Sequence, residues 1–526
     1  MLTYAKVCSA FAPWSRTKIV SSATILIVEE KTCKTKKANS PKKMTETKKS
    51  FNYWQIRTIV ITMVSYALFY FVRKNFSIAM PGLAAEFGIS KVSLGLFLTL
   101  HGIIYGLSRF ENGFITDRNS ARIVLSVGLM LCALANILFG FSDTIAGWIV
   151  ALANNMGTEL AFTSVLLYFM GIVWVINGYL QGMGVPPCTK TLTQWIHPKE
   201  LATKMSIWNM SHSIGAGLVF GLCGWYIMPH MGVDMSANAE AVANIASNLN
   251  LEVTDPKVLN FAAHYYAWRW CFIIPALFAM AGAIGSFLLW KDSPSDVGLP
   301  EIMGEKKAVV RTAEESAEYK AFIRRKVFGN RLIWTLALTN FFVYIVRFAA
   351  LDWGPTLLTE SKGLSLAMAT TLCIVFEFIG GNIGMVVAGW ATDHIFKNKA
   401  HHTCVFCMLG AAASIALFWI IPTGSPWWVM ILPFTFIGFF IYGPQALLGI
   451  AAANQATNRA SATANGILGI FGYASTLISG VGFGYVAQHY GWNGAYIVML
   501  AMAMMGVLSL LTMWSAKADG YDEKEA

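Results

Sequence analysis

The sequence predicts an all-α, polytopic membrane protein with 12 transmembrane helices in two six-helix halves related by pseudo-two-fold symmetry. The 526-residue chain is 56% hydrophobic and only 13% charged, whereas soluble proteins carry roughly 25% charged residues. Apolar runs of about 20 residues, long enough to cross a ~30 Å hydrocarbon core, recur along most of the chain. Short motifs also recur at a near-constant offset, which indicates an internal repeat.

The apolar runs place six spans in each half, and each is expected to be helical because lipid offers no partner to an unpaired backbone amide. The first six spans are expected near residues 56–80, 92–115, 122–142, 161–183, 203–228 and 268–290. The second six are expected near 331–351, 366–391, 403–421, 427–448, 460–487 and 492–514. The expected domains are a basic N-terminal tail (1–53), two halves (54–290 and 331–516), a hydrophilic linker between them (291–330) and a C-terminal tail (517–526).

Loop charge predicts the orientation. The net charge of +11 would suggest nucleic acid as a partner of a soluble protein. Here the basic residues lie in the N-terminal tail and in loops on one side, so we expect no nucleic-acid partner and both termini in the cytoplasm. The loop cations on that side include Arg118, Arg122, Lys190, Lys199, Lys204, Lys397 and Lys399.

The N-terminal 48 residues are polar and rich in Lys, with a short apolar run near Ile25 to Val28. A secretory signal needs a longer apolar core, so this segment is not expected to be one. Met44 and Met1 both remain open as the start. Most of the nine cysteines fall inside apolar spans and are expected to be reduced core residues.

Two pairs of motifs indicate the repeat. Tyr70-Phe71-Val72-Arg73 in the first span matches Tyr344-Ile345-Val346-Arg347 in the seventh, an offset of 347 − 73 = 274. Gly113-Phe114-Ile115-Thr116-Asp117 matches Gly389-Trp390-Ala391-Thr392-Asp393, an offset of 393 − 117 = 276. Secondary transporters place their binding site at such a repeat interface, near the middle of the membrane.

Arg73 and Arg347 lie well inside apolar spans, where a charge costs at least ~2.5 to 3.5 kcal/mol on insertion scales. Tyr66, Tyr70 and Arg73 share one helical face, and Tyr344 shares a face with Arg347. If the repeat brings these faces together, two guanidinium groups and several phenols converge, a donor set suited to phosphate oxygens. The alternative is that each Arg pairs with a buried carboxylate or extends to an interface.

Further charged and polar residues are candidates for the surroundings of this cluster. Lys74 either adds positive charge beside Arg73 or pairs with Glu377 or with Asp352, which would form a gating ion pair. His212 is either a phosphate-sensitive donor or a structural histidine. Tyr105 and Arg109 share a helical face and either line the pathway or extend to the interface.

Enzyme and metal chemistry find little support in the sequence. His401-His402-x-Cys404-x-x-Cys407 has ligand types that zinc accepts, but it lies where a loop enters the ninth span, so its cysteines are expected to face the bundle. No nucleophile elbow, P-loop or dinucleotide fingerprint is present. We therefore expect no enzyme activity, no metal and no cofactor.

The sequence resembles the organophosphate:phosphate antiporter family of the major facilitator superfamily from Asn52 to about Trp514. The motifs that carry the resemblance are Tyr66-x-x-x-Tyr70-x-x-Arg73-Lys74, Gly113-x-x-x-Asp117-Arg118-x-x-x-Arg122, Gly182-Met183-Gly184-x-Pro186-Pro187-Cys188, Trp208-Asn209-x-x-His212 and Tyr344-x-x-Arg347-x-x-x-x-Asp352-Trp353. The segments Tyr442 to Gly449 and Glu377 to Gly381 look similar to the hexose-phosphate branch. The N-terminal extension and a long loop from about Pro229 to His264 depart from the bacterial pattern.

The resemblance implies a phosphate site formed by Arg73 and Arg347 with His212 assisting, and a charge network of Lys74, Asp352 and Glu377. Tyr66, Tyr70, Tyr105, Tyr344 and Tyr442 are expected around it, with Arg109, Asp117 and Arg118 as gating residues. The expected protein is a monomer in the bacterial inner membrane that exchanges a sugar phosphate, glucose 6-phosphate first, for inorganic phosphate by alternating access. A glycerol-3-phosphate antiporter, a hexose-phosphate sensor and a proton-coupled sugar symporter are the alternatives.

Overall fold

The computed structural model describes residues 41–301, 313–456 and 460–517. Within these ranges the chain is helical apart from turns and one isolated antiparallel bridge between Val233 and Tyr265. Residues 57–526 form one compact unit, and the description below concerns that unit. The helical architecture confirms the predicted fold class.

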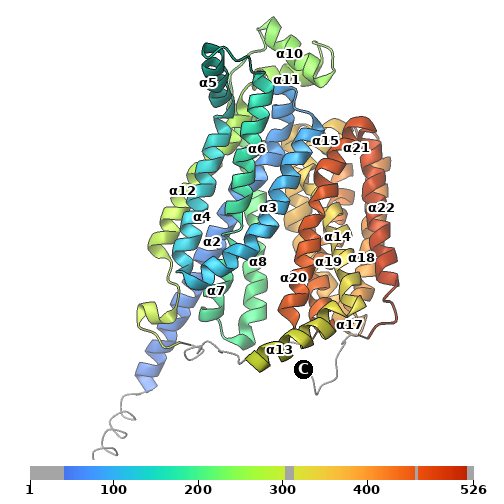
Figure 1. Ribbon diagram of the computed structural model, residues 1–526. Coiled ribbons are helices and arrows are strands. Elements are labelled where there is room, and N and C mark those ends of the chain that lie inside the picture. Colours follow the sequence, from blue (N-terminus) through green and yellow to red (C-terminus); the bar gives the residue numbers. More distant parts are fainter. Residues whose placement is uncertain (1–40, 302–312, 457–459, 518–526) are drawn as a thin grey trace, which may run out of the picture. The chain divides into compact units, whose positions relative to one another are not determined.

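The long helices of the N-terminal half pack side by side (Figure 1). They are α2 (Pro41–Phe87), α3 (Lys91–Arg118), α4 (Ala121–Gly140), α6 (Phe162–Gln181) continued by α7 (Val185–Trp195), α8 (Pro198–Gly221) continued by η1 (Leu222–Ile227) and α9 (Met228–His230), and α12 (Ala267–Leu289).

The C-terminal half repeats this arrangement after a linker. Its helices are α14 (Arg331–Asp352), α15 (Gly354–Lys362), α16 (Leu366–Ile374) continued by η4 (Val375–Gly381) and α17 (Asn382–His394), α18 (Ala400–Ile420), α19 (Trp427–Gln455), α20 (Ser461–Ala474) continued by η5 (Leu477–Gly482) and α21 (Phe483–His489), and α22 (Gly491–Leu511). The linker holds η2 (Pro294–Val297), α13 (Ala313–Ile323) and η3 (Arg324–Phe328).

Eleven helical stretches of the described chain are long and apolar enough to cross a membrane. They coincide with eleven of the twelve predicted spans, and α8 with η1 and α9 takes the place of the remaining one, predicted at 203–228. Side-chain caps fix where several spans begin. The Ser90 side chain accepts from Ser93 N at 3.1 Å before α3, and Asn330 Oδ1 accepts from Leu332 N at 3.0 Å before α14.

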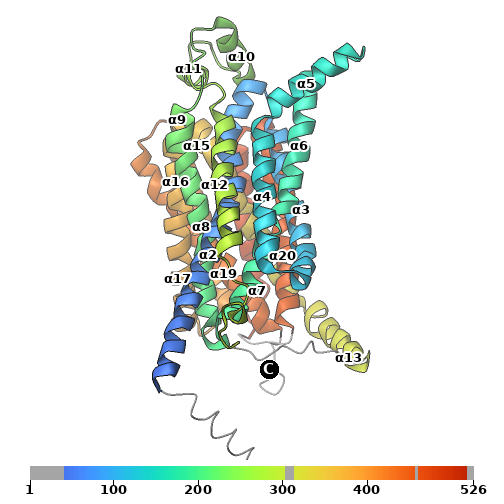
Figure 2. The same cartoon turned by 90° about the vertical axis from the view of Figure 1, so that its left-hand side faces the viewer.

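Three short helices lie at the end of the bundle opposite α13, and we name that end the cap face (Figure 2). They are α5 (Ser142–Asn155), α10 (Ala239–Leu249) and α11 (Pro256–Ala263). The segment 229–264, expected as a loop, therefore contains α10 and α11, which share a small apolar core around Ile245 and Val258. Asn248 Nδ2 donates to Ala85 O at 3.0 Å and ties this cap to the end of α2. The opposite end, where α7 and α13 lie, is the linker face.

The two halves contact each other along the cap-face side of α3. Lys91 pairs with Glu360 at 3.0 Å, and further along α3 Thr99 Oγ1 accepts from Val481 N at 2.8 Å. Glycines allow close backbone approach, because a Cβ at Gly95 would lie 2.5 Å from Gly480 O. Toward the linker face, the α3 side chains that contact the second half include Tyr105 and Arg109, which both meet Tyr473. The halves are thus closed at the cap face.

Candidate functional site

The first helix of each half carries one arginine of the predicted site. Arg73 lies on α2 and is partly exposed, and Arg347 lies on α14 and is 6% exposed. Both positions are inside membrane-spanning helices, where an uncompensated charge is costly. The surrounding side chains therefore show what stabilises each guanidinium.

Arg73 is surrounded by aromatic rings. Its guanidinium carbon lies 4.3 Å from the ring centre of Tyr105 and 5.6 Å from that of Tyr70. Such cation–π contacts are each worth roughly 0.5 to 2 kcal/mol. Within the described part of the chain, no carboxylate lies within ion-pair distance of Arg73. The guanidinium is therefore held in place by rings but keeps an uncompensated charge.

Arg347 has both a ring and a carboxylate beside it. Its guanidinium carbon lies 4.9 Å from the ring centre of Tyr442 and 5.8 Å from that of Tyr344. Glu377 Oε1 lies 3.7 Å from Arg347 Nη2, so a buried carboxylate does accompany this arginine. Arg347 Nε, both Glu377 oxygens and the Tyr442 hydroxyl nevertheless have no direct hydrogen-bond partner within the described chain. Hydrogen-bonding capacity thus remains for a ligand.

Lys74 pairs with Asp352, which resolves the two options that the sequence left open. This ion pair joins α2 of the first half to the end of α14 in the second. The ring centre of Phe348 lies 5.9 Å from Lys74 Nζ and 5.6 Å from the Arg347 guanidinium carbon. The Lys74 pair and the Arg347 site are therefore adjacent.

Tyr473 connects the two arginine environments, and sequence reasoning missed it. Its ring centre lies 5.0 Å from that of Tyr105 and 6.5 Å from that of Tyr344, and its hydroxyl accepts from Arg109 Nη1 at 3.3 Å. Tyr473 follows Gly472 in α20, a glycine-rich helix of the second half. The sequence signal that could have identified Tyr473 is its position as an aromatic residue among small residues. Unlike Arg347, however, Tyr473 has no matching residue in the first half at the repeat offset.

His212 borders the same cluster from α8. Its ring centre lies 5.7 Å from that of Tyr70, and its Nδ1 contacts the Asn209 carbonyl oxygen. Beside it, Tyr66 stacks on Trp208 at 5.0 Å. If Nδ1–H donates to the Asn209 carbonyl, Nε2 is the ring atom that can face a ligand. Its neighbour in the structure is Ser213 Oγ at 3.5 Å.

The cluster carries a net positive charge. Its cations are Arg73, Lys74, Arg109 and Arg347, and its carboxylates are Asp352 and Glu377, so the formal sum is 4 − 2 = +2. Both halves contribute cations, whereas both carboxylates belong to the second half. An arrangement of this kind favours an anion with two negative charges.

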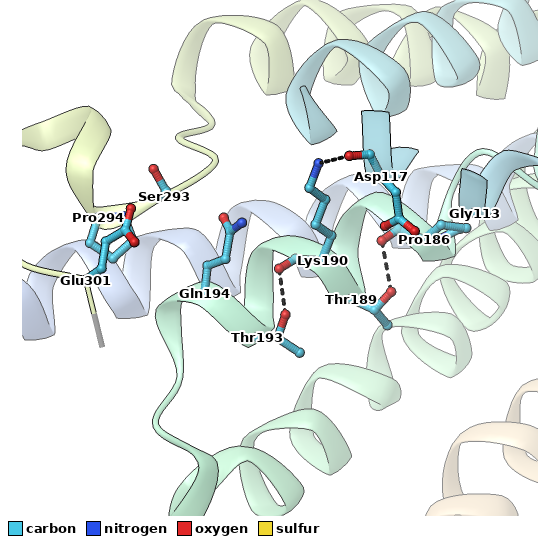
Figure 3. Close-up of a pocket in the computed structure, with 10 residues that line it drawn as sticks. All are labelled: Gly113, Asp117, Pro186, Thr189, Lys190, Thr193, Gln194, Ser293, Pro294 and Glu301. Carbon is cyan, nitrogen blue, oxygen red and sulfur yellow. Dashed lines mark hydrogen bonds between the residues drawn. The ribbon is translucent and has the colours of Figure 1, made fainter. Parts of the chain in front are cut away.

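Asp117 and Arg118 do not join the cluster. They end α3 at the linker face, eight and nine residues beyond Arg109, about 12 Å along a helix that rises 1.5 Å per residue. Asp117 lines a separate cavity of about 580 Å³, in which Lys190 Nζ donates to the carbonyl oxygens of Thr116, Asp117 and Asn119 (Figure 3). The other lining residues are Gly113, Pro186, Thr189, Thr193, Gln194, Ser293, Pro294 and Glu301. Lys190, the cation among the described lining residues, is thus already engaged with three carbonyl oxygens at the end of α3.

The motif that resembled a zinc site is built into the packing of the second half. Cys404 and Cys407 are buried, and His402 stacks on Trp514 at 3.9 Å while its Nε2 contacts Trp514 O at 2.8 Å. Within the described residues no group of three or more His, Cys, Asp or Glu side chains is arranged to hold a metal ion.

Comparison with known proteins identifies the family. Residues 62–472 match the Major Facilitator Superfamily. The chain is 32% identical to the "Probable hexose phosphate transport protein" of Chlamydia muridarum, with 89% of this chain and 93% of that protein covered. It is 31% identical to the "Glycerol-3-phosphate transporter" of Bacillus subtilis, covering 88% and 92%, and 30% identical to the "Membrane sensor protein UhpC" of Escherichia coli, covering 89% and 94%.

Solved structures agree on the fold. A D-xylose-proton symporter superposes with a TM-score of 0.61 at 16% identity, covering 89% of this chain and 99% of that one. Family and fold are those of membrane transporters and not of enzymes. The chain belongs to the organophosphate:phosphate antiporter family of the major facilitator superfamily.

Proposed function

We propose that this chain is a secondary transporter that exchanges a hexose 6-phosphate, glucose 6-phosphate first, for inorganic phosphate. The observation that carries the proposal is the cluster of net charge +2, built from both halves inside the membrane-spanning helices. A phosphate monoester carries about −1.5 to −2 charges at pH 7, so it compensates this cluster.

Arginine suits phosphate because its planar guanidinium offers paired donors to two oxygens. In the proposed site Arg73 and Arg347 bind the phosphate from opposite halves. His212 and the phenols of Tyr66, Tyr70, Tyr105, Tyr344 and Tyr442 supply further hydrogen bonds. Lys74 with Asp352, together with Glu377, keeps the charges of the two halves coupled.

Alternating access follows from how the halves meet. The cap-face contacts of α3 join the two halves, so they have to open for the site to face that side. Closing both sides around an empty site would leave two net positive charges in a medium of low dielectric constant. A bound phosphate compensates them, so the loaded protein reorients more easily. Obligatory exchange is the expected consequence.

The hexose preference rests on two sequence segments and on the relatives. The segments Tyr442 to Gly449 and Glu377 to Gly381 resemble the hexose-phosphate branch, and relatives described as hexose phosphate transport proteins match over nearly the whole chain. A glycerol-3-phosphate antiporter and a non-transporting sensor are the alternatives, because relatives so described match almost as well. A proton-coupled sugar symporter is less supported, since a mid-span carboxylate in the first half would be expected and Glu111 and Asp117 lie near the linker face.

We further propose that the protein is a monomer in the bacterial cytoplasmic membrane, with the linker face and both termini in the cytoplasm. Its partners are then the sugar phosphate, inorganic phosphate and the lipid bilayer, with no nucleic acid and no cofactor. Cation-rich loops on the linker face support this orientation.

Counterflow in proteoliposomes tests the proposal. Phosphate-loaded vesicles should take up glucose 6-phosphate faster than glycerol 3-phosphate, and unloaded vesicles should take up neither. The reverse preference would assign the protein to the glycerol-3-phosphate branch. Saturable binding of glucose 6-phosphate without uptake would identify a sensor, and uptake driven by a proton gradient without phosphate would identify a symporter.

A further inference from the structure

The first transmembrane helix is broken immediately before Arg73. Val72 has φ −98° and ψ 21°, outside helical geometry, although α2 continues on both sides. In a regular α-helix the carbonyl of residue 72 accepts from the N–H of residue 76. Here Phe76 N donates to the Asn75 side-chain oxygen at 3.1 Å. The proline in this helix is Pro81, nine residues further on, so it does not account for the break.

Three amide side chains from neighbouring helices donate to the carbonyl oxygen of Val72. Asn136 Nδ2 on α4 lies 2.9 Å away and Asn177 Nδ2 on α6 lies 3.3 Å away. Gln181 Nε2 on α6 lies 3.5 Å from the Val72 oxygen and also donates to Phe69 O at 3.0 Å. Inside a membrane no water is at hand to satisfy a carbonyl that leaves its helix. These three amides, which we name the Val72 clamp, take over that role.

The clamp is itself held in place. Asn136 Oδ1 accepts from Asn75 Nδ2 at 2.8 Å, and the same Asn75 group also donates to Cys271 O at 2.9 Å. Asn177 Oδ1 faces His101 Nε2 at 3.3 Å. The side chains of Asn75, Asn136, Asn177 and Gln181 are at most 2% exposed. Such a network fixes a single geometry because each group in it has a partner.

The second half has no counterpart to this arrangement. At the repeat offset of 274, Asn75 corresponds to Ala349, and α14 runs as one helix from Arg331 to Asp352. Arg347 therefore leaves a continuous helix, whereas Arg73 follows a break. The additional polar network of the first half thus lies next to Arg73, the arginine that contacts aromatic rings and has no carboxylate partner among the described residues.

We propose that Asn136, Asn177 and Gln181 are positioning residues for phosphate binding: by holding the break at Val72 they set the direction in which Arg73 leaves α2. This inference rests on the proposed function, because it needs Arg73 to bind phosphate. A binding group has to be held within ~0.5 Å and about 10–20° of its productive position, and the residues around it provide that precision. The ψ of 21° at Val72 differs by about 60° from the helical value, so restoring a regular helix would redirect the Arg73 side chain away from Tyr105.

A double-mutant cycle tests the clamp. Asn136→Leu and Gln181→Leu each remove one donor to Val72 O, and each is combined with Arg73→Lys and with Arg347→Lys. The measurement is the KM and the tracer-level rate of inorganic phosphate exchange in proteoliposomes. We expect each clamp variant to raise the phosphate KM at least fivefold with a smaller change in kcat. In the Arg73→Lys background, adding a clamp substitution should raise the phosphate KM less than twofold further. In the Arg347→Lys background, it should raise the phosphate KM by the same factor as in the unmodified protein.

Asn340→Leu is the matched control, because Asn340 is also buried and donates to a backbone carbonyl, that of Leu468, at 2.8 Å. Any increase in phosphate KM caused by Asn340→Leu should be the same factor with and without Arg73→Lys. Equal losses for the clamp variants in both arginine backgrounds would overturn the proposal, as would failure of both clamp variants to fold. Normal exchange in Arg73→Lys would instead overturn the proposed function. If Arg73→Lys is impaired but both clamp variants exchange normally, only the proposal for the Val72 clamp is overturned.

Discussion

The closed cap face predicts the effect of adding one methyl group at Gly95. A Cβ there would lie 2.5 Å from Gly480 O and 2.8 Å from its carbonyl carbon, both backbone atoms of the other half. Ordinary contact begins at 3.4 Å, so α3 and η5 have to separate by about 3.4 − 2.5 = 0.9 Å. Overpacking of this kind costs roughly 1 to 3 kcal/mol. Because each 1.4 kcal/mol is a factor of ten, Gly95→Ala should shift the balance about five- to 150-fold toward the state open at the cap face.

Spin labels at Leu96 on α3 and Tyr485 on α21 can report this shift. Both side chains are exposed, 42% and 50%, and the native cysteines of the described chain are buried. Pulsed electron resonance should show one short distance in the unmodified protein and a growing longer component in Gly95→Ala. Gly469→Ala is the control, because a Cβ there meets nothing within 4 Å. An unchanged distance distribution in Gly95→Ala, or the same change in the control, would refute the packing argument.

Two further predictions concern orientation and charge. Tags placed after Lys49 and after Asp522 should both be cytoplasmic because the cation-rich loops lie on that side, and labelling of either tag from outside intact cells would contradict this. Asp352→Asn leaves Lys74 without its carboxylate and should destabilise the protein by about 3 to 5 kcal/mol. The double variant Asp352→Asn, Lys74→Met should regain thermal stability without regaining exchange. Equal stability of the unmodified protein, the single variant and the double variant would show that the ion pair contributes nothing.

Much of the fold could be predicted because the membrane restricts a chain to few solutions. Apolar length marks the spans, and the offset between Arg73 and Arg347 marks the repeat. The same reasoning placed both arginines beside tyrosines, since a charge in an apolar span needs compensation. The segment 229–264 lies outside the spans as expected, but the short helices α10 and α11 within it, which pack on each other, were not predicted.

Contacts between helices could not be predicted in the same way. Tyr473 reaches the cluster from α20 through packing against Tyr105, and no local pattern encodes that neighbour. Lys74 had two acidic candidates within reach, and only the relative position of α2 and α14 selects Asp352. The break at Val72 has no proline or glycine to announce it, because amides from α4 and α6 stabilise it.

Conservative replacement of the two arginines tests the central claim most directly. Arg73→Lys and Arg347→Lys keep the charge but lose the paired donors, and one charge-assisted hydrogen bond is worth about 1.5 to 3 kcal/mol. We predict at least a tenfold loss of inorganic phosphate exchange in each well-folded variant, whereas Arg331→Lys, at the exposed start of α14, should exchange normally. Near-normal exchange in Arg73→Lys or Arg347→Lys would contradict the proposed phosphate site.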